Sequence, residues 1–144
     1  MSDDDLTHAP IPDVDRLARL SIGRRSDGTV EVYGPPTAVL SLARWLRRPT
    51  DGHVDAAGPT REATDESLVG IAVRLGADAV TLTVVEGVLV VAGSAEGFGP
   101  VAEAIEVVGV GALDLRYAPI ERRTTLDGAG PVTVVVASAY PSDG

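Results

Sequence analysis

The sequence predicts an α+β fold built on a strand–strand–helix–strand unit that occurs twice in the chain. Residues 28–50 read GTVEVYGPPTAVLSLARWLRRPT, and residues 87–109 read GVLVVAGSAEGFGPVAEAIEVVG. With an offset of 59 and no gap, the glycines and the apolar positions of the two segments coincide. Apolar residues alternate as in a strand and then recur every three or four residues as in a helix. We therefore expect a mostly antiparallel sheet with two helices packed on one face, in a single pseudo-symmetric domain over residues 15–140.

Each unit, about residues 18–56 and 78–117, begins with a predicted β-hairpin. In the first unit, ARLSIGR and TVEVYG flank a turn at Asp27 and Gly28. In the second unit, VTLTV and VLVVAG flank a turn at Glu86 and Gly87. Glycine adopts the positive φ that tight turns require, so these positions predict where each hairpin reverses.

A helix and a third strand follow each hairpin. The first helix has apolar residues at helical spacing from Val39 to Leu46, between prolines at both ends, and we expect it to end near Arg47. The second keeps this phase from Phe98 to Ile105, and the glycines before Pro100 predict that its regular part starts near that proline. GHVDAA and GALDLRYA then predict the third strand of each unit.

Two segments lie outside the predicted repeat. SLVGIAVRL, from Ser67, fits both a strand and a helix over residues 68–75, and we favour a strand because β-branched residues occupy alternate positions. PVTVVVASAY, from Pro131, predicts a final buried strand. Residues 1–14 predict an acidic disordered tail, and residues 141–144 a second tail.

The composition argues against most kinds of catalytic site. The chain has no cysteine and two distant histidines, so we predict no disulfide, no metal site and no cofactor. Its glycines do not form a dinucleotide fingerprint. His53 and Asp55 are two residues apart on a predicted strand, as a base and its orienting acid would be, but exposed polar residues of a strand give the same pattern. We predict no catalytic residue and therefore no enzyme, with a small-ligand site at this pair as an alternative.

Charge is unevenly distributed along the chain. The formal net charge is -9, and residues 16–48 carry seven arginines against two acids. An acidic background favours basic protein partners and opposes nucleic acid and anionic membranes. No apolar run reaches the ~18 residues of a membrane span, and the N-terminus lacks signal-peptide features, so we expect a cytoplasmic protein.

The basic segment and the tryptophan each allow more than one interpretation. The arginine cluster predicts a phosphate or nucleic-acid site, a solvated helix face, or pairing with Glu103 and Glu106. The tryptophan fits a residue at the edge of the core or an exposed anchor. The cluster comprises Arg24, Arg25, Arg44, Arg47 and Arg48. The expected partner-binding positions are Trp45, Asp51, His53, Asp55, Glu62, Asp65, Glu66 and Asp114.

One stretch of the repeat is similar to a known family. The run x-V-x-V-x-G from Gly28 to Gly34, a proline-bearing link, the helical pattern ending in Leu42, Ala43 and Leu46, and then residues 52–55 resemble the immunity protein 32 family of actinobacterial polymorphic toxin systems. The second copy matches from residue 87 to 105, so the resemblance covers about half the chain.

The resemblance implies a non-enzymatic protein that binds and neutralises a cognate toxin domain, and it carries over no catalytic residue. The expected partner is then a basic toxin domain. The alternative is a structural or self-associating module, in which apolar strands pair across a two-fold interface and form a homodimer.

Overall fold

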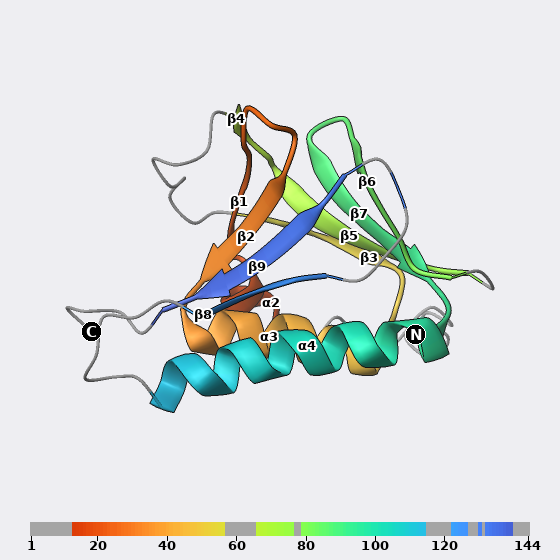
Figure 1. The fold of residues 1–144 in the computed structure, drawn as a ribbon. Coiled ribbons are helices and arrows are strands. Elements are labelled where there is room, and N and C mark those ends of the chain that lie inside the picture. Colours follow the sequence, from red (N-terminus) through yellow and green to blue (C-terminus); the bar gives the residue numbers. More distant parts are fainter. Residues whose placement is uncertain are drawn as a thin grey trace, which may run out of the picture.

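The computed structural model describes residues 13–56, 66–76, 79–114, 122–126, 130 and 132–139. These residues form two long helices, one short helix and nine strands, which confirms the α+β class (Figure 1). The predicted tails lie outside the described residues except for positions 13 and 14, and Val14 begins the short helix. The helices are α2 (Val14–Leu17), α3 (Pro36–Arg47) and α4 (Ala95–Asp114).

The strands form two sheets, so the prediction of one sheet is wrong. The first sheet has the order β4-β1-β2-β9-β8, and the second has the order β3-β5-β7-β6. Only the β2–β9 and β5–β7 pairs are parallel, so the predicted antiparallel majority is confirmed. The first sheet contains β1 (Ser21–Arg24), β2 (Val30–Gly34), β4 (Glu66–Ser67), β8 (Arg122–Thr125) and β9 (Val134–Ser138). The second contains β3 (Gly52–Asp55), β5 (Gly70–Leu75), β6 (Thr81–Val85) and β7 (Val88–Gly93).

The two copies exchange strands, which is why there are two sheets. The hairpin β1–β2 belongs to the first copy, but its sheet continues with β9 and β8 of the second copy. The hairpin β6–β7 belongs to the second copy, and its sheet continues with β5 and β3 of the first. The registers are equivalent, since Val30 pairs with Val134 as Leu89 pairs with Ile71. The two segments predicted to lie outside the repeat, which form β5 and β9, are therefore the fourth strands of its two copies. The prediction that SLVGIAVRL forms a strand and not a helix is confirmed for residues 70–75.

The second helix differs from its prediction at both ends. It starts at Ala95 rather than near Pro100, because the hydroxyl of Ser94 accepts a hydrogen bond from the amide of Gly97 at 3.0 Å and caps the first turn. Residues 111–114 continue this helix, so the strand predicted for GALDLRYA is wrong over these residues, and residues 115–118 lie outside the described part of the chain. Buried residues at 105, 108 and 112 keep the helical spacing that explains the extension.

Both helices lie side by side beneath the two sheets (Figure 1). They are antiparallel, because Arg47 contacts Glu106 while Gly109 lies against Leu40. Positions 47 and 106 are equivalent in the two copies, so their contact marks an approximate two-fold axis between the helices. The core fills the space between helices and sheets. Its largest members are Trp45, Phe98, Leu17, Leu20, Leu42, Leu46, Leu82, Leu89 and Ile105.

Candidate binding surface

The outer strand β3 carries the predicted residues His53 and Asp55 at one edge of the second sheet, and the predicted Asp51 directly precedes this strand. Val54 points into the core, so the residues on either side of it face away from the core. The His53 Nε2 atom lies 3.3 Å from Asp55 Oδ1, and their side chains are 44% and 83% exposed. The structure thus brings this pair together, in contact with water.

A glycine on the neighbouring strand allows this arrangement. Asp55 pairs with Gly70 of β5, and a Cβ at position 70 would lie only 2.7 Å from His53 Nε2 and 2.5 Å from the carbonyl oxygen of Val54. The imidazole therefore lies across the backbone of β5. An acid–base pair does its work best where water is excluded. This pair is open to solvent, and its geometry favours a surface role.

Asp51 has a structural role at the start of β3. Its Oδ1 accepts a hydrogen bond of 2.6 Å from the backbone amide of Leu75, at the end of β5. The guanidinium of Arg74 donates to the carbonyl of Gly52 at 3.3 Å. These contacts fasten the ends of the two strands, and a substitution at Asp51 would disturb the sheet as well as its surface.

Glu66 is exposed on β4 of the first sheet, where it pairs in register with Arg24 of β1, and the segment that follows it leads into β5, the neighbour of β3. Leu68 donates its amide to Ile22 of the first sheet at 2.8 Å, and Ala56 donates to Val69 at 2.9 Å. This segment therefore joins the two sheets. Glu66 stands four residues from Gly70, the partner of Asp55, which is about 13 Å along an extended chain. We call Asp51, Asp55 and Glu66 the acidic rim.

The remaining predicted positions do not join the rim. Trp45 is 0% exposed, and its indole nitrogen donates to the carbonyl of Thr50 at 3.1 Å. The core interpretation of this tryptophan is confirmed, and the exposed-anchor interpretation is wrong. Glu62 and Asp65 lie outside the described residues. Asp114 is the last residue of α4, and the structure describes its backbone but not its side chain.

Three of the five clustered arginines are paired with acids. Arg44 contacts Asp13, and Arg25 contacts Glu31. Arg47 donates from Nε and Nη2 to the two carboxylate oxygens of Glu106, at 3.2 and 3.3 Å. The predicted pairing with helix two is confirmed for this residue. Because these cations are compensated within the chain, the basic segment contributes less to the outer field than its sequence charge indicates.

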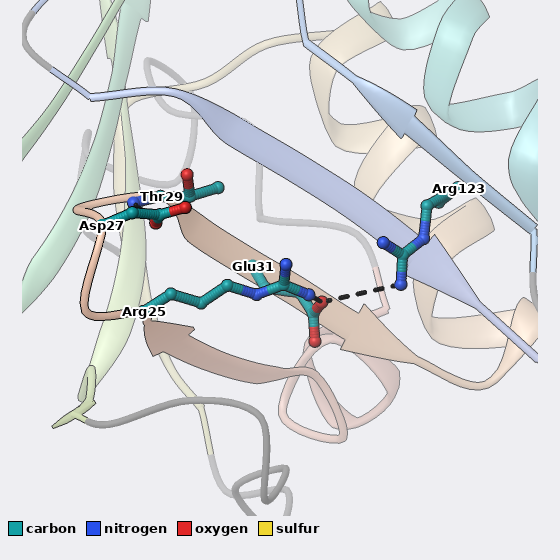
Figure 2. A network of polar contacts seen from close by, with 5 residues as sticks. All are labelled: Arg25, Asp27, Thr29, Glu31 and Arg123. Carbon is teal, nitrogen blue, oxygen red and sulfur yellow. Dashed lines mark hydrogen bonds and ion pairs between the residues drawn. The ribbon is translucent and has the colours of Figure 1, made fainter.

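Sequence reasoning missed Glu31, the most deeply buried charged side chain among the described residues. It is 1% exposed on β2, and Arg25 and Arg123 approach its carboxylate from opposite sides (Figure 2). Two guanidinium groups around one buried carboxylate form a structural ion-pair network. The signal was present, since Glu31 interrupts an apolar strand that follows two arginines.

The turn beside this network has a second carboxylate. Asp27 Oδ1 accepts a hydrogen bond of 2.9 Å from the backbone amide of Thr29. This bond lowers the pKa of Asp27 below its ordinary value, because it favours the charged form. The contact fixes the turn between β1 and β2.

Within the described ranges, no three or more histidine, aspartate or glutamate side chains form a group that could hold a metal ion. No helix of this part of the chain is long and apolar enough to cross a membrane. Comparisons of the chain with models of protein families, with curated proteins and with solved structures find no match.

Proposed function

We propose that this protein is a non-enzymatic, cytoplasmic inhibitor of the immunity-protein type, which binds a basic toxin domain through its acidic rim. The observation that carries the proposal is the exposure of this rim on a chain in which three of the clustered arginines are compensated internally. The Asp55 side chain is 83% exposed, and Glu66 is exposed on the short strand β4. Arg25, Arg44 and Arg47 each contact an acid of the same chain.

The electrostatics of the whole chain support a basic partner. With a net charge of -9, the molecule attracts cationic surfaces over distances of about one Debye length, about 8 Å at physiological salt. Such a field accelerates encounter with a basic partner, and the exposed acids select its orientation on contact. An inhibitor needs no catalytic group, since covering the active site of the toxin is sufficient.

The experiment that tests the proposal is affinity capture from native lysate, followed by binding measurements with the purified captured domain. The rim variant carries Asp55→Asn and Glu66→Gln. A matched control carries Glu96→Gln and Glu103→Gln, which are exposed on α4 and remove the same total charge. Asp51 is left intact because it holds the amide of Leu75.

We expect one basic domain to be captured and its activity to be inhibited. The rim variant should weaken binding at least tenfold, and the control less than threefold, since only the rim contacts the partner. If both variants lose affinity equally, the loss comes from the change in net charge, and the rim is not the binding surface. An absence of inhibition of the captured domain would rule out the inhibitor function itself.

A further inference from the structure

The outer face of the helix layer, which points away from both sheets, carries two neighbouring exposed valines. Val107 and Val110 of α4 are 66% and 47% exposed, and they line a shallow hollow together with Glu106 and Gly111. The sheet-facing side of α4 is already filled by buried residues such as Ile105 and Val108. The exposed valines therefore belong to the opposite side of the helix.

Charges of opposite sign border these valines on the two helices. Arg44, Arg47 and Arg48 are exposed on or at the end of α3, and Glu103 and Glu106 lie on α4. Positions 44 and 103 are equivalent in the two copies, as are 47 and 106, so the repeat has reversed its charge at both. The layer thus presents a basic stripe beside an acidic stripe. The stripes are partly compensated within the chain, because Arg44 contacts Asp13 and Arg47 contacts Glu106, and Arg48 and Glu103 lie at their ends.

Two copies of this face can pair with the basic stripe of each on the acidic stripe of the other, if a two-fold axis relates them. A two-fold axis in the plane of the layer and parallel to the helices places α3 of one molecule over α4 of the other. Arg48 then faces Glu103 of the second molecule, because the Arg47–Glu106 contact puts these residues within one helical turn of the same level. Val107 and Val110 meet Leu40 and the aliphatic stem of Arg44.

We propose that the helix layer is a homodimer interface, with a second copy of this chain as its occupant. The acidic rim lies on the strands and stays open, so each dimer presents two rims. Helices of 12 and 20 residues are about 18 and 30 Å long, and their common face is of the order of 500 Å². This is smaller than the roughly 800 Å² per partner of a standard interface, so the dimer is a weak one that salt dissociates further.

The test is sedimentation equilibrium of the purified full chain from about 1 to about 300 µM, at low and high salt. We expect the mass to rise toward that of a dimer with concentration, and added salt to weaken the association. A monomer over the whole range at low salt would overturn the proposal.

Two matched variants locate the surface. Val107→Arg places a cation opposite the arginines of the second molecule, and Val85→Arg makes the same change at a valine that is 54% exposed on β6. We expect the first to weaken dimerisation at least tenfold and the second less than twofold. Equal weakening would place the contact elsewhere and contradict the proposal.

A charge swap tests the orientation. Arg48→Glu and Glu103→Arg should each weaken the dimer several-fold, and the double variant should restore it, because the contact then re-forms with reversed sign. Failure of the restoration, with each variant still folded by circular dichroism, would overturn the two-fold arrangement. This inference is independent of the proposed function, since Val107→Arg should still bind the captured basic domain while the rim variant should still dimerise.

Discussion

At the scale of single residues, the structure depends on a few positions where charge or backbone geometry permits no simple replacement. Glu31 is buried in a strand that is otherwise apolar, and its carboxylate is stable there because two guanidinium groups approach it. The equivalent position of the second copy is Val90, which needs no such compensation. Equivalent strand positions of the two sheets are therefore occupied by a paired carboxylate in one case and by an apolar side chain in the other.

Replacing Glu31 by glutamine should lower the free energy of unfolding by about 1–3 kcal/mol, because the side chain keeps its shape but no longer compensates Arg25 and Arg123. The arginines are partly exposed, which keeps the loss below that of a fully buried pair. Urea unfolding measures it. Glu103→Gln, at an exposed site, should change stability by less than about 0.5 kcal/mol. Equal effects would show that burial of Glu31 contributes nothing.

Asp27 should make stability depend on acid pH in a defined direction. Its folded pKa is lowered, so its bond to Thr29 stabilises the protein above the ordinary aspartate pKa. This contribution is lost as the pH falls through the lowered value. Urea unfolding of the native chain and of Asp27→Ala from about pH 7 to about pH 3 should show a difference that shrinks with acidity. A difference that grows with acidity would contradict the assignment.

Gly130 should be intolerant of any side chain. Its φ is +126°, and a Cβ there would lie 2.3 Å from the carbonyl oxygen of Leu82 in β6. We expect Gly130→Ala to lower the free energy of unfolding by about 2 kcal/mol or more. Gly99→Ala is the control, because its Cβ would enter open space in α4 and should stabilise by up to about 1 kcal/mol. Thermal or urea unfolding of both variants would decide.

At the scale of elements, the two long helices are held by a close approach as well as by the Arg47–Glu106 pair. A Cβ at Gly109 would lie 2.7 Å from Cγ of Leu40, so glycine allows α4 to come near α3. The helix tolerates this glycine, although alanine would be intrinsically preferred by about 1 kcal/mol. Packing between the helices therefore prevails over local propensity at this position.

A double-mutant cycle tests that balance. Gly109→Ala should cost about 1–2 kcal/mol of unfolding free energy in the native chain, because Leu40 must move. In a Leu40→Ala background the same change should cost nothing or stabilise by up to about 1 kcal/mol. Urea unfolding of the four proteins gives the coupling. Additive effects would mean that the two residues do not interact.

How far each element could be predicted depends on how local its cause is. Both hairpins and α3 follow from turn glycines and apolar spacing within a dozen residues, and the structure confirms them. The extension of α4 to Asp114 was missed, although Val108 and Ala112 kept the helical phase. The pairing of β9 with β2 is set by residues 104 positions apart, which no local pattern reveals.

The candidate surface shows the same limit. Alternation along β3 predicts that His53 and Asp55 share a face, and the structure brings them together. The place of Glu66 could not be predicted, because it depends on the segment that joins the two sheets through Leu68. The burial of Trp45 was one of two open alternatives, since its position beside the apolar stripe fits both a core residue and an anchor.

At the scale of the whole molecule, exchange of strands makes the two copies depend on each other. Neither sheet is complete within one copy, because each hairpin is extended by strands of the other. We expect fragments 1–76 and 77–144 to be unfolded alone and to fold when mixed. Circular dichroism and thermal melting of each fragment and of the mixture would test this. A cooperative melt of either fragment alone would show that one copy is an independent folding unit.

The exchanged strands also bear on how such a chain arises. In a polypeptide with one copy, the hairpin would lack the strands that extend it into a sheet. Two identical molecules could supply these strands to each other. Duplication of the gene for such an intertwined pair, with the copies joined end to end, would give the present strand order. Within one chain the two halves can differ, as they do where Trp45 is equivalent to the small Ala104 and Arg47 to Glu106. Because the contact between Arg47 and Glu106 joins unlike charges, two identical halves would bring like charges together there, and we expect each half to prefer the other over a copy of itself.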